Sequence, residues 1–419
     1  MDKRTAIGIR DFSFELTTVG ELVKRGALER PIDGNHGEIH PKASDFVDEG
    51  VPFIMASDLK NGRVDYNNCA FISERQAEGL RKGFAKNGDV LLTHKATIGE
   101  TAIVDYDQHP YIMLTPQVTY YRVKDHSVLN NRYLKAYFDS SLFQQTLQML
   151  AGSGSTRAYL GITEQHRLPI ILPPPDKQEK IAAVLATLED LIANNLRRIA
   201  LLESMAEEIY REWFVRMRFP GVSDDELHAG RPKSWAVRKL GELLELCYGK
   251  ALPDQNRVPG KVPVYGSGGI VGYHNTALVS TPGIIVGRKG NVGSVFLAEQ
   301  PFFPIDTVYY VKSTLPNELL VFLLQRMNFI NNDSAVPGLN REQAYSNEVL
   351  LPETQLIDQF ADTVKPMFKQ AALLRQQVES LCGTRDALLP RLISGKLRVD
   401  QLDIQFPPSM RAETAKAAP

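Results

Sequence analysis

Apolar residues along the chain follow a strand-like pattern that occurs twice. Residues 90–104 (VLLTHKATIGETAIV) and residues 284–298 (IIVGRKGNVGSVFLA) each place apolar, β-branched runs on both sides of a small-residue turn that contains a lysine. This arrangement predicts one β-hairpin in each copy. Residues 118–123 (VTYYRV) and 307–312 (TVYYVK) combine β-branched and aromatic residues, so they predict one further strand in each copy.

The two copies keep the same order of segments over most of the chain. Residues 131–150 space Leu and Phe as one amphipathic helix, and residues 317–324 repeat its first part. From Leu160, which aligns with Leu339, the offset between the copies stays constant to about residue 214. The repeat therefore predicts two domains of one design rather than one large core.

A long helix is predicted after each strand-rich part, because apolar residues there alternate at spacings of four and three. In the first copy the seam positions are Ile181, Leu185, Leu188, Ile192, Asn195, Ile199, Leu202, Ala206, Ile209 and Trp213. In the second copy they are Phe360, Val364, Met367, Ala371, Leu374, Val378, Leu381, Arg385, Leu388 and Leu392. One such helix alone would be explained by an ordinary core face. Two helices in one register favour pairing with each other, in antiparallel orientation.

The seam carries two polar exceptions. Asn195 would fix the register of the pair at some cost in stability, and Arg385 is expected to extend its charged end into solvent. The stretch 181–213 would span roughly 50 Å as a helix and keep two globular parts separate.

The sequence thus predicts an α+β protein with two mixed, strand-rich domains, joined by two long helices in an antiparallel coiled coil with a pseudo-two-fold internal repeat. The predicted boundaries are 1–171 for the first globular domain, 172–218 for the central helix, 219–350 for the second globular domain, 351–398 for the distal helix and 399–419 for a C-terminal tail.

Composition narrows the class of protein. The 419 residues are 43% hydrophobic and 23% charged, which is typical of soluble globular proteins. No stretch approaches 18 consecutive apolar residues, and the N-terminus has no apolar signal region, so we expect a cytoplasmic protein. Cys69, Cys247 and Cys382 show no C-x-x-C spacing and are expected to be buried thiols rather than zinc ligands or disulfides.

The net charge of −1 gives no global electrostatic case for nucleic-acid binding. A DNA-binding role would need local basic clusters. Three are present, around Lys82, Arg238 and Arg288. Each cluster alone is better explained by a solvated surface.

At this point the residues resemble a known family, the specificity subunit of bacterial or archaeal type I restriction-modification systems. The resemblance covers roughly residues 14–398 and depends on order and repetition rather than on one motif. The segments that carry it are GDVLLTHKATIGETAIV (88–104), STRAYLGITEQHRLPIILPPPDKQEKIAAVL (155–185), VPVYGSGGIVGYH (262–274), SAVPGLNREQ (334–343) and LLPRLISGKL (388–397).

The resemblance implies that each globular domain is a DNA target-recognition domain for one half of a bipartite double-stranded site, with the helices as a spacer. It implies docking of two methyltransferase subunits, which would bind S-adenosylmethionine, and of motor and nuclease subunits for restriction. The start of the second helix departs from the family pattern, because LPETQLIDQF replaces the proline-rich and basic LPPPDKQEKI of the first. The docking surface is therefore better matched in the first copy.

The hairpins suggest where two half-sites could be distinguished. Lys95 and Lys289 repeat, which favours a phosphate contact or loop support, whereas the residues beside them differ and could read bases. A purely scaffolding hairpin is the alternative. The residues expected to contact DNA are Asn35, His36, Lys42, Lys60, Arg63, Thr93, His94, Lys95, Thr97, Ser155, Thr156 and Arg157 in the first domain, and Lys250, Arg257, Ser267, His274, Arg288, Lys289 and Asn291 in the second.

No motif predicts catalysis, a metal site or a cofactor in this chain. GSGGIVG at 266–272 does not fit the dinucleotide-binding spacing, and the sequence lacks the [DN]-P-P-[YF] signature of adenine methyltransferases. Two alternatives stay open: a coiled-coil adaptor whose globular ends bind proteins, and the specificity chain of another restriction class that pairs with a fused nuclease-methyltransferase.

Overall fold

The computed structural model describes residues 14–152, 159–222, 227–228, 231–329, 338–400 and 402–410. Contacts group the chain into two compact units. The first unit combines residues 1–194 with 379–419, and the second unit is residues 195–378. Each unit therefore contains its own globular part and a stretch of both long helices.

Two sheets form the globular part of the first unit. The strand order is β10-β9-β12-β2 in one and β3-β7-β4-β11-β8 in the other, while β1 pairs with β13 and β5 with β6. The strands are β1 (Glu15–Thr18), β2 (Ile32–Asp33), β3 (Phe46–Val47), β4 (Val51–Ile54), β5 (Leu59–Lys60), β6 (Arg63–Val64), β7 (Ala70–Ile72), β8 (Phe84–Ala85), β9 (Val90–Lys95), β10 (Thr97–Ile103), β11 (Ile112–Leu114), β12 (Val118–Tyr121) and β13 (Pro169–Leu172).

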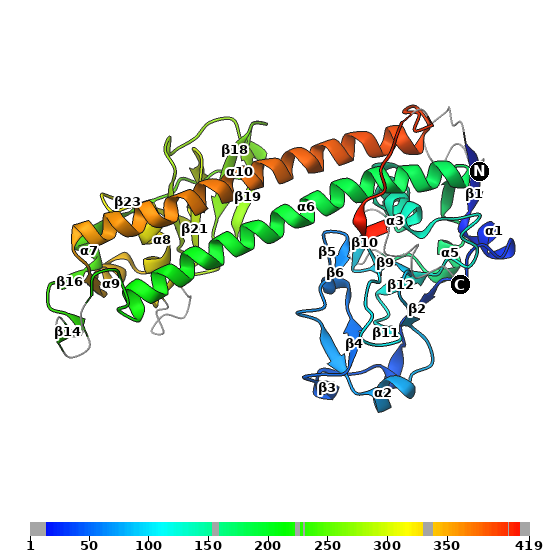
Figure 1. Ribbon diagram of the computed structural model, residues 1–419, viewed down its shortest axis with the longest axis horizontal. Helices are drawn as coiled ribbons and strands as arrows, with labels where there is room; N and C mark the ends of the chain where they lie inside the picture. Colours follow the sequence, from blue (N-terminus) through cyan, green and yellow to red (C-terminus); the bar gives the residue numbers. More distant parts are fainter. Residues whose placement is uncertain are drawn as a thin grey trace. The chain divides into compact units, whose positions relative to one another are not determined.

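The four-stranded sheet is buried on both faces, because successive side chains of a strand point to opposite sides. Val90 and Leu92 of β9 enter a helical core, whereas Leu91 faces a core shared with the second sheet. The far side of the second sheet is covered by α2, through Ala77. Figure 1 shows this order of layers in the first unit, from α6 through α3 and β9 to β4 and α2. The helices are α1 (Val19–Lys24), α2 (Glu74–Glu78), α3 (Asn131–Asp139), α4 (Ser141–Leu150), α5 (Ile162–Gln165) and the start of α6 (Pro175–Tyr210).

The prediction of one helix over residues 131–150 was wrong, since α3 ends and α4 begins at Ser140. Ser140 has an extended backbone, and its hydroxyl accepts a hydrogen bond from the amide of Phe143 and donates one to the carbonyl of Tyr137. Serine is a strong N-cap residue because its hydroxyl satisfies an amide that the next helix leaves free. The cap explains why the periodic pattern divides there.

The second unit has fewer strands in the same arrangement. Its sheets have the orders β17-β23-β20-β21 and β19-β18-β22, with β16 paired to β24 and β14 to β15. The strands are β14 (Leu227–His228), β15 (Arg231–Pro232), β16 (Ala236–Lys239), β17 (Leu244–Tyr248), β18 (Val262–Gly266), β19 (Gly269–His274), β20 (Gly283–Gly287), β21 (Val295–Ala298), β22 (Phe303–Pro304), β23 (Val308–Ser313) and β24 (Glu348–Leu351). The helices are α7 (Leu240–Leu243), α8 (Asn317–Gln325), α9 (Arg341–Ser346) and part of α10 (Thr354–Ile393).

Strand pairing confirms both predicted hairpins and refines the alignment of the copies. β9 pairs antiparallel with β10, and β20 with β21. Thr93 lies opposite Val118, whereas the equivalent Gly287 lies opposite Val308. Val118 therefore corresponds to Val308, one residue away from the match that the letters VTYYRV and TVYYVK predict.

Both long helices are present and run antiparallel within each unit. In the second unit, Asn195 of α6 lies near Gln377 of α10, and Tyr210 further along α6 packs on Phe360 nearer the start of α10. In the first unit, the core that contains Ile181 and Leu185 also contains residues from the end of α10. Figure 1 shows α6 and α10 as the two long ribbons.

The structure places every predicted seam residue in a buried or half-buried position. The buried ones are Ile181, Leu185, Ile192, Asn195, Ile199, Ala206, Phe360, Val364, Ala371, Leu374 and Leu392. The half-buried ones are Leu188, Leu202, Ile209, Trp213, Met367, Val378, Leu381, Arg385 and Leu388. Trp213 lies in a π-helical turn, Arg211–Val215, that continues α6.

Several smaller expectations can be compared with the structure. Asn195 donates from Nδ2 to Oε1 of Gln377 over 3.3 Å, and Arg385 pairs with Asp386 at the surface. Only Cys69 is buried; Cys247 and Cys382 are half-exposed, so the burial predicted for those two was wrong.

Within the ranges described above, no helix has the length and apolar character needed to cross a membrane.

The hairpin turn allows a stability test with a matched reverse change. Ala96 has a φ of 65°, at the position where the second copy has Gly290 with a φ of 76°. An L-residue in this region costs roughly 1–2 kcal/mol, partly offset in any Ala-to-Gly change by the freer unfolded chain. We expect Ala96→Gly to raise the free energy of unfolding by about 0.5 kcal/mol, and Gly290→Ala to lower it by about 1 kcal/mol, in urea denaturation followed by circular dichroism. A loss of stability in Ala96→Gly would contradict a strained turn.

Candidate nucleic-acid interface

Three segments meet at the lysine end of the hairpin in each unit, and we call this place the three-segment junction. The hairpin strand forms one part, and the residues just before α5 or α9 form the second. Leu160 donates its amide to the carbonyl of His94 over 3.0 Å, and Leu339 donates to that of Arg288 over 2.9 Å. The neighbouring bridges join Lys95 to Tyr159 and Lys289 to Gly338. The same backbone contact is thus built twice.

The third segment is the end of β2 or β17 and the glycine after it. A Cβ atom on Gly34 would lie 1.9 Å from the carbonyl oxygen of Leu114, and one on Gly249 would lie 2.1 Å from that of Ile305. Only glycine permits such a close approach of two backbones. The approach brings the residue before each glycine, Asp33 or Tyr248, to the junction.

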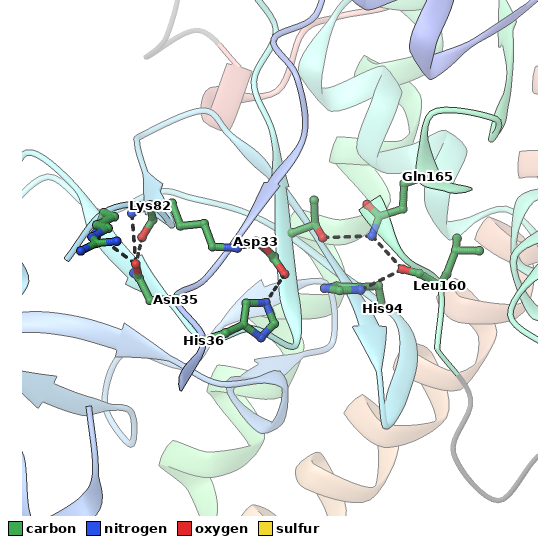
Figure 2. A network of polar contacts seen from close by, with 9 residues as sticks. Asp33, Asn35, His36, Lys82, His94, Leu160 and Gln165 are labelled. Carbon is green, nitrogen blue, oxygen red and sulfur yellow. Dashed lines mark hydrogen bonds and ion pairs between the residues drawn. The ribbon is translucent and has the colours of Figure 1, made fainter. Parts of the chain in front are cut away.

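In the first unit this residue organises a polar network. The buried carboxylate of Asp33 accepts hydrogen bonds from Nζ of Lys82 and from Nε2 of His36, which lies 2.8 Å away. Burial alone would raise the pKa of Asp33, but the two partners outweigh it and lower the pKa below its usual value. Figure 2 shows the network together with the side chain of Asn35, which holds the loop at Lys82.

His94 lies at the other side of this network and is fully buried. Its Nδ1 donates to the carbonyl of Leu160 over 3.0 Å, and that carbonyl also accepts from Nε2 of Gln165 over 3.1 Å. Figure 2 shows the second ring nitrogen of His94 facing away from Leu160. This Nε2 has no hydrogen-bond partner among the described residues. Desolvation by burial lowers the pKa of His94, so the ring is held neutral.

In the second unit the junction is cationic and aromatic. Arg288 donates from Nε and Nη2 to the carbonyl of Asp306 over 3.2 and 2.8 Å, and its guanidinium lies 5.3 Å from the ring centre of Tyr248. Arg341 lies 5.4 Å from the same ring. The hydroxyl of Tyr309 donates to the carbonyl of Leu339 over 3.4 Å. The equivalent carbonyl in the first unit is that of Leu160, which accepts from His94 and Gln165.

The structure buries three of the residues that were predicted to contact DNA. Thr93 and His94 are completely buried and Asn35 nearly so. Their polar atoms are used inside the protein: the hydroxyl of Thr93, for example, accepts from the amide of Glu100 at the hairpin bulge. In this conformation the polar groups of these side chains hold the loops and strands of the first unit.

Other predicted residues are exposed at or beside the junctions. They are His36, Lys95, Thr97, Lys250, Lys289 and Asn291. The amide of Asn291 lies 3.4 Å from Oγ of Ser267, so the structure brings these two together.

The remaining predicted residues are held by partners elsewhere in their units. Arg257 is bound to Asp254 and to a backbone carbonyl. His274 accepts from the amide of Val258. Lys60 forms an ion pair with Asp65, close to the paired strands β5 and β6. Lys42 lies in a loop near α2. Arg63 pairs with Asp190 of α6. Ser155, Thr156 and Arg157 lie outside the described residues.

Three junction residues were missed from the sequence: Asp33, Tyr248 and Arg341. The dipeptides Asp33-Gly34 and Tyr248-Gly249 contain a repeated glycine that could have aligned the third segment. Arg341 lies far from the second hairpin along the chain, so no local pattern connects it to that hairpin. Within the described ranges, no group of three or more His, Cys, Asp or Glu side chains is placed to hold a metal ion.

The two domains share one backbone frame, differ in the side chains at the junction and are each followed by a long helix. Residues 31–204 and 232–381 match the family described as the type I restriction modification DNA specificity domain, so the chain belongs to this family.

Individual relatives agree with this membership. The chain is 26% identical to the type I restriction enzyme MjaIX specificity subunit of Methanocaldococcus jannaschii, over 93% of this chain and 97% of that protein. It is 20% identical to the HindI specificity subunit of Haemophilus influenzae, over 83% and 94%. Its fold resembles that of an S subunit from M. genitalium, with a TM-score of 0.54, 17% identity and coverage of 92% and 97%.

The buried histidine gives a pH-dependent prediction. Because the pKa of His94 is lowered in the folded state, the unfolded chain binds a proton more readily below its ordinary pKa of about 6.5. The free energy of unfolding should then fall as the pH falls through this value, with no contribution above pH 7.5. Between pH 7.5 and 5.5 we expect the native chain to lose about 1 kcal/mol more than His94→Asn, which keeps a donor for Leu160. If the free energy of unfolding falls in parallel for the two proteins as the pH is lowered, His94 is not the source of the pH dependence.

Proposed function

We propose that this chain reads a bipartite double-stranded DNA sequence, with one half-site for each target-recognition domain. The observation that carries the proposal is the three-segment junction. Its backbone hydrogen bond and close glycine approach are repeated, whereas its side chains change from Asp33 and His94 to Tyr248 and Arg288. A repeated frame with different functional groups is what two readers of different base sequences require, since base edges are distinguished by donor and acceptor patterns.

The long helices support a spacing role in this proposal. A continuous helix of 36 residues, as in α6, spans roughly 54 Å at 1.5 Å per residue. A rigid spacer of this kind would turn the distance between two readers into a fixed number of unread base pairs. We propose that two methyltransferase subunits, and motor and nuclease subunits through them, dock on the chain in the cytoplasm.

The chain itself has, in this proposal, no catalytic site and no bound S-adenosylmethionine, which belongs to the methyltransferase partner. The names of the curated relatives, all specificity subunits of type I restriction enzymes, support this division. The competing function is a two-headed protein adaptor. Its main difference is that it predicts no selection among DNA sequences.

A selection experiment separates the two functions. The full-length chain, with and without a cognate methyltransferase subunit, is incubated with a random duplex pool, and the retained DNA is sequenced. We expect two specified segments at a fixed distance. Retention without any sequence preference in both conditions would favour the adaptor.

The repeated lysines give a second test. Lys95 and Lys289 are exposed beside the junctions, and a phosphate contact carries no sequence information. We expect Lys289→Ala to weaken binding about equally for all selected duplexes and to reduce the slope of log K against log salt by about 1. Lys95→Ala should behave in the same way. A changed sequence preference at either half-site would instead make the lysine a base reader.

A further inference from the structure

We propose that Tyr248, Arg288 and Arg341 together form a guanine-reading cluster in the second domain, with the two arginines as base contacts and the tyrosine as their positioning residue. This inference rests on the proposed function and deepens it. The cluster joins three segments that are distant along the chain: the end of β17, the end of β20 and the start of α9.

The guanidinium of Arg288 is fixed along one edge only. Its Nε and Nη2 atoms donate to the carbonyl of Asp306. Nη1 has no hydrogen-bond partner in the described part of the chain, so the outer Nη1–Nη2 edge remains available. This edge presents two parallel N–H groups, which is the geometry that matches the O6 and N7 acceptors of guanine.

Arg341 makes fewer polar contacts than Arg288. Its guanidinium makes no hydrogen bond to a described residue, and its only ion pair in the described ranges is a 3.9 Å contact with Glu342. It is held instead by aromatic rings, at 5.4 Å from the centre of Tyr248 and 6.0 Å from that of Tyr345. An arginine placed on a ring keeps its planar donors directed outward, because cation–π attraction uses the face of the guanidinium and not its edge.

Tyr248 is the common support. It is 52% exposed, and its ring centre lies 5.0 Å from that of Tyr309. Both guanidinium groups lie within 5.5 Å of its ring centre. Two like charges at one ring repel each other, and an acceptor edge of a base would relieve this repulsion.

The equivalent place in the first domain has the opposite chemistry, and this contrast favours base reading over a general phosphate contact. Asp33 occupies the position of Tyr248, since each pairs with the same site of the neighbouring strand, Thr119 or Tyr309. Asp33 is an acceptor that is already bound by Lys82 and His36, so this place offers no pair of arginine donors to guanine. A sequence-independent anchor would be expected in both domains, as the repeated Lys95 and Lys289 are.

The test uses the full-length chain, with its methyltransferase subunit where binding requires it, on the duplex selected by the native protein. Arg288→Lys and Arg341→Lys keep the charge but remove the planar fork. We expect each to reduce the preference for guanine at one position of the second half-site by at least tenfold, with the first half-site unchanged. Replacing that guanine by 7-deazaguanine, which lacks the N7 acceptor, should weaken the native chain about tenfold and leave the corresponding variant unaffected.

Tyrosine variants test the positioning role. Tyr248→Ala should relax the same positions, and Tyr248→Phe, which keeps the ring, should preserve them. Arg211→Ala is the control, because it removes an exposed arginine that pairs with Glu207 of α6 away from this cluster.

The outcomes are distinct. An equal loss of affinity for all duplexes, with a shallower salt dependence, would make the arginines phosphate contacts and overturn the inference. An unchanged preference would overturn it as well, while the proposed function would stand. If the native chain selects no sequence at all, the proposed function fails and the inference fails with it.

Discussion

A repeated backbone contact joins the segments of the three-segment junction in each globular part. The amide of Leu160 or Leu339 donates to the hairpin strand one residue before the repeated lysine, while Gly34 or Gly249 lets a third segment approach within the space of a missing Cβ atom. These contacts use main-chain groups, so they do not depend on the identity of the surrounding side chains. Two domains that share this frame can therefore differ in the side chains at the junction. Substitution of either glycine would separate the segments that the frame joins.

The two junctions carry side chains of different charge on the same backbone frame. In the first domain, Asp33 is buried and neutralised by Lys82 and His36, and His94 turns inward to the carbonyl of Leu160. In the second domain, arginines replace this inward network and face a half-exposed tyrosine. The first junction uses its polar groups mainly to hold loops, and the second leaves donors available. Side chains at equivalent positions therefore make different contacts in the two domains.

Much of the architecture could be predicted from periodicity. The hairpins, the paired helices and their antiparallel direction all follow from patterns that local spacing and repetition reveal. Two features of the fold could not be predicted from periodicity. Ser140 divides a periodic helix because its hydroxyl caps the following turn, and a one-residue shift separates Val118 from the letter-based match. At the site, spacing identified the hairpin ends but not Asp33, Tyr248 or Arg341, because these residues join the junction through tertiary contacts. Burial of Thr93 and His94 was equally invisible in the sequence.

The division of the chain into units has a consequence for biosynthesis. The second unit is one continuous stretch, residues 195–378, whereas the first unit needs residues 379–419 in addition to the N-terminal 194. Its core contains Leu389, Ile393 and Met410 together with the start of α6. Domains commonly fold in the order in which they leave the ribosome. The core of the first unit can be completed only after Leu389, Ile393 and Met410 have been added, and these residues follow the second unit along the chain, so the second unit is the first to have all of its residues available for folding.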